Sequence, residues 1–125
     1  MIKPISIKIY PPEGGALQVD EAVLDTKCGI VGNKHDDISF LSRDAFEFQN
    51  KNPDGMCMAR FKENMVVDVN FQGLDVLEIG TATVEMTEGK RFCFDSCKYF
   101  SESELCPFKA GITFGRVVKN GIIKT

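Results

Sequence analysis

The sequence predicts a mainly β fold, a compact barrel or closed sheet with one or a few short helices. Short runs of alternating or β-branched apolar residues recur along the chain, glycine-containing turns separate them, and one segment carries clear helix signals. At 125 residues the chain is long enough for one domain with its own core and too short for two. Residues 1–125 are therefore expected to form a single domain.

The first third of the chain reads as strands joined by turns. Residues 2–10 alternate isoleucine with serine and lysine, which is the period of a half-buried strand. Residues 11–15, Pro-Pro-Glu-Gly-Gly, end this strand in a turn. Residues 16–26 alternate again in part and predict another strand, and residues 38–41 form a short apolar run.

One segment has the signals of a helix. Ser42 is a good N-cap, and an acidic residue follows in the first turn. Residues 52–55, Asn-Pro-Asp-Gly, stop the helix because the residue before a proline resists helical geometry and Asp-Gly favours a turn. We therefore predict a short helix over Arg43–Lys51.

The remaining elements are expected to be strands. Residues 65–69 are rich in β-branched valine, and Val76–Ile79 and residues 81–87 alternate on either side of Gly80. Two further apolar runs, residues 112–118 and 122–124, are joined through Lys-Asn-Gly. Because Asn-Gly between two β-branched runs is a strong hairpin signal, the last two strands are expected to pair with each other.

Composition excludes several classes of protein. A net charge of −3 and a pI near 5.2 leave no overall basic field to collect phosphates, so no nucleic-acid partner is expected, although a local basic cleft remains open. The amino terminus lacks the apolar core of a signal peptide, and no run approaches membrane-spanning length. A cytoplasmic protein without a membrane partner is therefore expected.

The most informative segment is residues 88–107, which carries three of the five cysteines: Cys93, Cys97 and Cys106. Three cations border the C-x3-C pair: Lys90, Arg91 and Lys98. Nearby cations lower a thiol's pKa and raise its thiolate fraction, and the thiolate is the form that attacks sulfur or binds a metal. One interpretation is therefore an accessible thiolate that carries sulfur or ligates a soft metal.

Two other interpretations of these cysteines stay open. A structural zinc site would need a fourth ligand from far along the chain, either Cys28, Cys57 or His35. Alternatively the thiols are buried and inert, which suits Cys28 and Cys57 in their apolar surroundings and Cys106 beside a proline and a phenylalanine. Five is an odd number, so a complete internal disulfide framework is excluded.

Two further polar stretches could line a site. Residues 28–37, CGIVGNKHDD, are either an ordinary polar loop or a loop that offers Lys34 and His35 to an anion. Around residues 60–63, Arg60 and Lys62 are either part of a solvated strand face or the basic lining of a pocket.

At these residues the chain resembles the MOSC domain, the module named for the carboxy-terminal part of molybdenum cofactor sulfurase and also found as small stand-alone bacterial proteins. The resemblance runs over about residues 29–123 and rests on four segments in the right order. These are GIVGNKH with the following ISFLSRD, ARFKENMVV, LEIGTATVEMTEGK and CPFKAGITFGRVVKNGIIK.

The resemblance implies a MOSC-type β-barrel and a cysteine that carries sulfur or coordinates the molybdenum of a pterin cofactor. Cys97 matches the reactive second cysteine of the family pattern G-K-x-C-H-x-x-C, and Cys93 matches the first. By position, four residues would surround the phosphate of the pterin: Lys34, His35, Arg60 and Asn64. The chain departs from the pattern at Asn33, where the family usually has Asp, and at Phe94, where it usually has His.

The expected function is therefore that of a sulfur carrier or a molybdenum–pterin-binding protein acting through the Cys97 thiolate, which would also be the metal ligand. Its expected partners are a cysteine desulfurase or other sulfur donor and a molybdoenzyme acceptor. The alternative is a non-catalytic module that binds a molybdopterin or another anionic ligand through Lys34, Arg60 and Lys90. Whether the protein is an enzyme stays open at this point.

Overall fold

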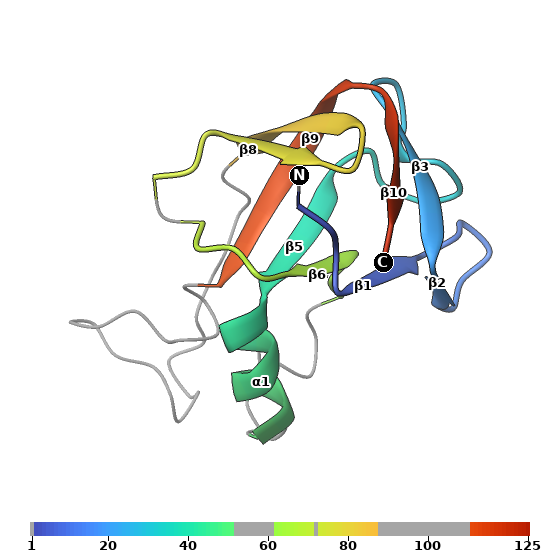
Figure 1. The fold of residues 1–125 in the computed structure, drawn as a ribbon. Coiled ribbons are helices and arrows are strands. Elements are labelled where there is room, and N and C mark those ends of the chain that lie inside the picture. Colours follow the sequence, from blue (N-terminus) through green and yellow to red (C-terminus); the bar gives the residue numbers. More distant parts are fainter. Residues whose placement is uncertain (1, 52–61, 72, 88–110) are drawn as a thin grey trace.

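The fold is mainly β, as the sequence predicts (Figure 1). The computed structural model describes residues 2–51, 62–71, 73–87 and 111–125. The strands in these ranges are β1 (Ser6–Ile9), β2 (Leu17–Val19), β3 (Glu21–Asp25), β4 (Gly29–Ile30), β5 (Ile38–Ser42), β6 (Met65–Val67), β7 (Val76–Ile79), β8 (Ala82–Thr87), β9 (Ile112–Lys119) and β10 (Gly121–Lys124). Within the same ranges, the helix is α1 (Arg43–Lys51), with the bounds predicted from the sequence.

The strands form two sheets. The larger sheet has seven strands in the order β2-β1-β6-β5-β9-β8-β7, and the smaller has the order β10-β3-β4. Every paired neighbour is antiparallel except β5 and β6, which run parallel. A parallel pair needs a crossover connection, and α1 lies between β5 and β6 in the sequence for this reason.

The seven-stranded sheet curls until its two sides approach each other. Ile2, just before β1, forms a parallel bridge with Ile79 at the end of β7. The Gly80 N–H also donates to the Ile2 carbonyl at 3.1 Å. Within the described residues this single bridge links the β1 side of the sheet to the β7 side, so the sheet is barrel-like and closed at one point only.

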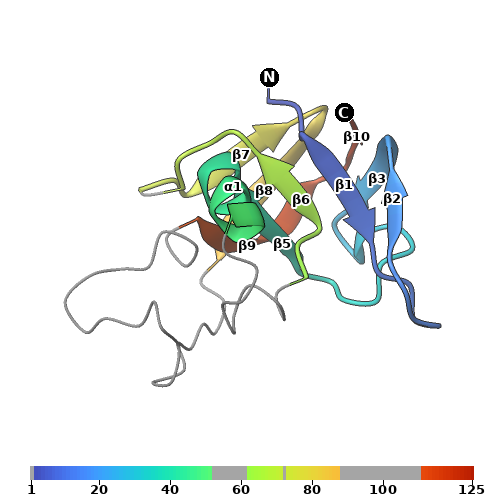
Figure 2. The same ribbon diagram turned by 90° about the horizontal axis from the view of Figure 1, so that it is seen from below.

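The main core fills the inside of this curl. Its buried side chains come from both sheets, so the small β10-β3-β4 sheet covers the open side of the large one (Figure 2). The largest of them are Phe40, Ile7, Leu24, Ile30, Ile38, Met65, Leu77, Ile79 and Ile123. Burial of aliphatic and aromatic side chains of this size, at about 1.5–3 kcal/mol each, is the main force that holds the two sheets together.

A second, smaller apolar cluster lies on the outer face of the large sheet, under α1. It consists of Leu41, Ala45, Val66 and Ile112, so the helix packs on β5, β6 and β9. The Ser42 hydroxyl accepts the Ala45 N–H at 3.2 Å, which is the N-cap that the sequence predicts. In Figure 1 α1 lies below the large sheet, whereas β3 and β10 lie at the upper right.

The predicted terminal hairpin is wrong. β10 pairs with β3 instead of β9, because β5 and β8 already occupy the two edges of β9. Neither Asn120 nor Gly121 has the positive φ that a type I′ hairpin turn requires. Gly121 instead lies against the backbone of Thr81 and Ala82, where an added Cβ would come within 2.4 Å of Thr81 C.

The strand predicted over residues 16–26 is also divided. β2 ends at Val19 and pairs with β1 in the large sheet, whereas β3 begins at Glu21 and pairs with β10 in the small sheet. Asp20 stands at the corner between the two sheets, and its carbonyl accepts the Thr125 N–H at 2.9 Å. The core-facing positions change parity at this corner, from Val19 on β2 to Ala22 and Leu24 on β3, where Val23 is exposed.

Candidate functional site

A row of side chains crosses the outer face of the large sheet beside the α1 cluster. Thr87 of β8 pairs with Phe114 of β9, which pairs with Ser39 of β5. Asn64, one residue before β6, continues the row, because its N–H donates to the Ser39 carbonyl at 2.9 Å. Lys8 of β1 ends it, since its N–H donates to the Asn64 carbonyl at 2.6 Å.

Strand alternation explains why this row faces outward. Phe40 and Met65 pair with each other across β5 and β6 and belong to the main core. Successive residues of a strand point to opposite faces, so their neighbours Ser39 and Asn64 point to the face that carries α1. The helix covers the next apolar positions along these strands, and the row beside it is left as the floor of a cavity.

This cavity has a volume of about 670 Å³, within the usual range for small-molecule and cofactor sites. Ser39, Asn64 and Phe114 form its floor. One wall comes from the end of β1 and the following turn, and the other from the loop before β5 and from Lys62. The complete lining is Tyr10, Pro11, Pro12, Gly14, Gly15, Asn33, Lys34, His35, Asp36, Asp37, Ser39, Lys62, Asn64 and Phe114.

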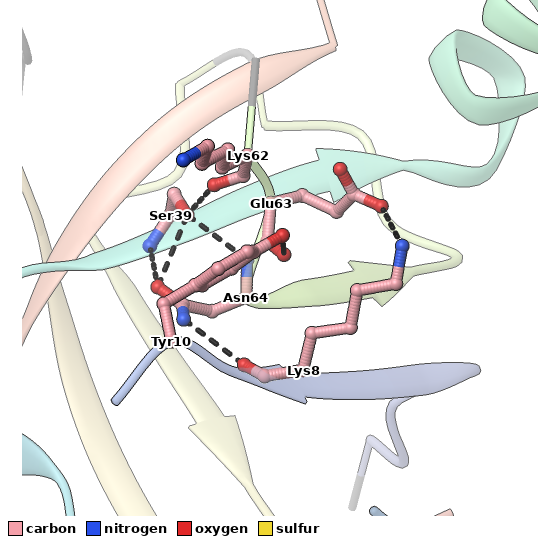
Figure 3. Close-up of polar contacts among 6 residues, drawn as sticks. All are labelled: Lys8, Tyr10, Ser39, Lys62, Glu63 and Asn64. Carbon is pink, nitrogen blue, oxygen red and sulfur yellow. Dashed lines mark hydrogen bonds and ion pairs between the residues drawn. The ribbon is translucent and has the colours of Figure 1, made fainter. Parts of the chain in front are cut away.

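The Asn64 side chain is the most heavily bonded group in the floor (Figure 3). Its Oδ1 accepts the Ser39 N–H at 3.0 Å, and its Nδ2 donates to the Lys8 carbonyl at 3.0 Å and to Asn33 Oδ1 at 3.1 Å. Its residue is 3% exposed. The amide therefore already uses both of its donors, and its main role in the structure is to join β1, β5 and the loop before β5.

The Ser39 hydroxyl completes this group. Its Oγ accepts the Asn64 N–H at 2.9 Å and lies 2.8 Å from the Lys62 carbonyl and 3.1 Å from Asn64 Oδ1. A hydroxyl carries one proton, so it donates to one of these two oxygens at a time. The polar atoms of the floor are satisfied by one another, and a ligand must find its contacts on the walls.

Tyr10 supplies the aromatic wall. Its hydroxyl donates to the Glu63 carbonyl at 3.0 Å, and Lys62 Nζ lies 6.0 Å from the centre of its ring. Burial, with a smaller contribution from the negative charge of Glu63, raises the pKa of Tyr10 to about 12. Tyr10 therefore stays neutral at physiological pH and presents a ring face and a phenolic oxygen to the cavity.

Behind Tyr10 lies a partly buried ion pair, in which Glu63 is nearly buried and Lys8 is about one-third exposed. The Glu63 side chain is 6% exposed, and its Oε1 lies 3.1 Å from Lys8 Nζ (Figure 3). A carboxylate buried to this degree needs a partner, since loss of one member of such a pair is strongly destabilising. The pair therefore fixes β1 against the chain that enters β6, and with it the position of Tyr10.

The loop of residues 31–37 reaches the cavity because it folds back over Gly29. The carbonyl of Asp36 lies so close to Gly29 that an added Cβ would come within 2.2 Å of it, and Gly29 has a φ of +74°. Only glycine combines that φ with that approach at no steric cost. The polar stretch recognised in the sequence is thus bent into a tight loop, with Lys34 and His35 exposed at the cavity.

The structure brings together the predicted site residues that it describes. Lys34, His35 and Asn64 all line the one cavity, although Asn64 follows His35 by 29 positions. The other predicted site residues lie outside the described residues: Arg60, Lys90, Cys93 and Cys97. The same holds for Cys57 and Cys106, whereas Cys28 is a free, half-buried thiol.

Sequence reasoning missed Tyr10, Ser39 and Phe114 as cavity residues. Tyr10 and Phe114 read as the ends of apolar alternation, and Ser39 as the polar break in a buried run. The signal that could have found Ser39 is strand alternation. Successive residues of a strand face opposite sides of the sheet, so if Ile38 and Phe40 face the core, Ser39 faces away from it. For Lys62 the sequence left two interpretations open, a solvated strand face or the basic lining of a pocket. In the structure Lys62 lines the cavity.

The walls of the cavity suit a flat or anionic ligand. Lys34 and Lys62 carry positive charge, His35 can donate or accept a proton, and Tyr10 and Phe114 offer ring faces. Asp36 and Asp37 make the rim mixed in sign. Within the described residues, no group of three or more His, Cys, Asp or Glu side chains is placed to hold a metal ion.

Comparison with known proteins supports the fold. No family model matches the sequence, and no curated protein matches it. The chain is similar to a crystal structure described as that of a hypothetical protein, with a TM-score of 0.61 and 17% sequence identity. The match covers 99% of this chain and 63% of that chain, so this chain spans less than two thirds of that protein's length. At this identity the likeness shows a shared fold alone.

The helix α1 is too short to span a membrane. Its nine residues fall well short of the roughly 20 apolar residues that a membrane-spanning helix needs. In the part of the chain that the structure describes, no helix could cross a bilayer.

Proposed function

We propose that this protein is a MOSC-type sulfur carrier or molybdenum–pterin-binding protein that acts through the thiolate of Cys97. The observation that carries the proposal is the convergence of Lys34, His35 and Asn64 on one cavity of about 670 Å³. The resemblance of the sequence to MOSC domains selects these residues for cofactor binding, and the fold then gathers them from two separate loops. The mainly β, barrel-like architecture agrees with the same resemblance.

The chain positions that flank the two remaining candidate segments support a shared site. Thr87 directly precedes residues 88–110, which contain Lys90, Cys93 and Cys97, and it pairs with Phe114 in the cavity floor. Lys62 directly follows residues 52–61, which contain Arg60, and it lines the cavity. Thr87 and Lys62, the described residues next to these two segments, therefore lie at or beside this cavity.

The residues at the cavity fit an anionic cofactor of the size of a molybdopterin. Lys34 and Lys62 would attract its phosphate, and the ring of Tyr10 would lie against its flat part. Asn64 and Ser39 would hold the floor dry and rigid beneath it, since their polar atoms are already paired. When bound, the cofactor supplies a molybdenum centre, for which a thiolate such as that of Cys97 is a suitable ligand.

Sulfur transfer would use the same thiolate. The Cys97 thiolate attacks the terminal sulfur of a persulfide on a donor such as a cysteine desulfurase. A new S–S bond forms on Cys97, the S–S bond of the donor breaks, and the donor cysteine leaves as a thiolate. The terminal sulfur of the persulfide on Cys97 is then attacked in the same manner by a cysteine thiolate of the acceptor protein, a molybdoenzyme, and Cys97 leaves as a thiolate.

The test is the intact mass of the protein purified from a host that makes the molybdenum cofactor. We expect a mass increase of one sulfur atom, or a co-purified pterin, in the wild-type protein and neither in Cys97→Ser. Cys28→Ser is the matched control, since Cys28 is a free thiol distant in sequence from the C-x3-C pair, and it is expected to behave as wild type. Equal loss in both variants would contradict a specific role for Cys97.

A second candidate is a non-catalytic module that binds a molybdopterin or another anion. The two ammonium groups of Lys34 and Lys62 favour it, because binding an anion through them needs no cysteine. In this case Cys97→Ser retains the pterin, whereas Lys34→Ala releases it. Stoichiometric zinc in protein purified without a chelator would instead favour a structural metal site built by the cysteines of residues 93–106.

A further inference from the structure

Asn33 holds three segments of the chain together through one side-chain amide. Its Oδ1 accepts the Tyr10 N–H at 2.9 Å and Asn64 Nδ2 at 3.1 Å, and its Nδ2 donates to the His35 carbonyl at 3.0 Å. The Tyr10 N–H can only donate, so the atom that faces it must be the oxygen, and the orientation of the amide is fixed. All donors and acceptors of this arrangement are therefore matched.

The backbone of the same loop adds two contacts. The Lys34 N–H donates to the Tyr10 carbonyl at 2.7 Å, and the Asn33 N–H donates to the Ile30 carbonyl at 3.0 Å. Tyr10 thus bonds to the loop through both its N–H and its carbonyl. The two residues that follow Asn33 are Lys34 and His35, whose side chains are exposed at the cavity.

We propose that Asn33 is a positioning residue: its amide fixes the loop that presents Lys34 and His35 to the cavity, and an amide is needed because one of the three bonds requires a donor. Only the identity of the ligand that Lys34 and His35 contact depends on the proposed function. The hold on the loop is a property of the chain itself and can be tested without a ligand.

The donor requirement distinguishes asparagine from aspartate at this position. An ionised carboxylate could still accept from Tyr10 N and Asn64 Nδ2, but its second oxygen would face the His35 carbonyl with no proton between them. A protonated carboxyl could donate to that carbonyl as the amide does. Asn33→Asp should therefore hold the loop at low pH and weaken its attachment at the His35 carbonyl once the new carboxyl ionises.

The groups around Asn33 that carry charge or titrate come from three elements. They are Lys34, His35, Asp36 and Asp37 on its own loop, Lys8 and Tyr10 on β1 and at its end, and Lys62 and Glu63 before β6. They are present in every variant proposed below. Comparison of Asn33→Asp with Asn33→Ala at the same pH therefore isolates the carboxyl at position 33.

The experiment measures amide hydrogen exchange by NMR on the full chain, expressed as protection factors so that the intrinsic effect of pH cancels. We expect Asn33→Ala to lower the protection of Tyr10 and Lys34 by about tenfold, the effect of one or two lost hydrogen bonds, at every pH. Near pH 8 Asn33→Asp should lie between Asn33→Ala and wild type, because its carboxylate keeps the two accepted bonds and loses the donated one, and it should return towards wild type near pH 4, where more of the carboxyl is protonated.

Two controls keep the result specific. Asn50→Asp adds the same charge at an exposed position of α1 and should leave Tyr10 and Lys34 unchanged. The amides of core residues such as Phe40 and Met65 report global unfolding, so a variant that is merely unstable loses protection there as well. Protection of Tyr10 and Lys34 within about twofold of wild type in Asn33→Ala would overturn the inference.

A second titration separates this inference from the proposed function. Inorganic pyrophosphate, a small anion, is added to wild type and Asn33→Ala while the amide shifts of Lys34 and His35 are followed. We expect several-fold weaker binding in Asn33→Ala, because the loop must be ordered as the anion binds. If pyrophosphate leaves the wild-type spectrum unchanged, the anion site of the proposed function fails, and the exchange data still decide the role of Asn33.

Discussion

Replacement of Asn64 by alanine should cost more stability than any other single change in the cavity floor. The variant removes the acceptor of the Ser39 N–H and the donor to the Lys8 carbonyl, both in a region where Ser39 is 7% exposed. It also removes one of the two donors to Asn33 Oδ1, the other being the Tyr10 N–H. Backbone groups that lose a partner away from water pay the full cost of desolvation.

The magnitude follows from these contacts. A buried donor left without an acceptor costs about 1–3 kcal/mol, and each further hydrogen bond lost with a partner that water can reach costs about 1 kcal/mol. We therefore expect Asn64→Ala to lower the free energy of unfolding by about 3 kcal/mol, a large fraction of the roughly 5–15 kcal/mol of a typical domain. Asn50→Ala, at an exposed position of α1, should change it by less than about 0.5 kcal/mol.

Urea unfolding followed by far-UV circular dichroism measures both variants, and a double-mutant cycle with Ser39→Ala measures their coupling. The bond that both substitutions remove is the one between Ser39 Oγ and Asn64 Oδ1, so the cycle should give a coupling free energy of about 0.5–1.5 kcal/mol. A loss below about 1 kcal/mol in Asn64→Ala, or additive effects in the cycle, would refute the view of this amide as the central tie of the floor.

Two further changes test the walls of the cavity. Gly29→Ala places a Cβ within 2.2 Å of the Asp36 carbonyl, whereas Gly73→Ala meets nothing within 4 Å at the same φ of +74°. Urea unfolding should therefore show a loss of about 1 kcal/mol for Gly73→Ala, from the left-handed backbone alone, and at least about 2 kcal/mol more for Gly29→Ala. Tyr10→Phe removes the hydrogen bond to the Glu63 carbonyl and should cost about 1 kcal/mol near neutral pH. Since folding raises the pKa of Tyr10 from 10.0 to about 12, the neutral ring contributes stability that is complete below pH 10 and is lost as the pH rises through 12. Thermal unfolding between pH 9 and pH 12 should thus show a steeper loss of stability for wild type than for Tyr10→Phe, and parallel curves would contradict the assigned pKa.

Local signals in the sequence determined the elements whose formation depends on near neighbours. The helix over Arg43–Lys51 follows from its N-cap and from the Asn-Pro-Asp-Gly stop, and its bounds agree with the structure. The strand of residues 2–10 and the strand Val76–Ile79 follow from alternation, which depends only on which face is buried. Lys34 and His35 were predicted as anion donors from their polar loop, and all three of Lys34, His35 and Asn64 from a resemblance of motifs; the structure places the three at one cavity.

Only the tertiary structure decided which strands pair and what the polar side chains do. The Asn-Gly dipeptide favours a hairpin locally, but β9 has no free edge, so β10 crosses to β3. Asn64 reads as one more polar residue in the sequence, and it becomes a fully bonded tie because Ser39, Lys8 and Asn33 come to it from three distant segments. Which strands pair, and which polar side chains are fully hydrogen-bonded, both depend on the backbone groups that are still without a partner once the other strands have paired. Those groups are set by the whole fold and cannot be read from a local sequence pattern.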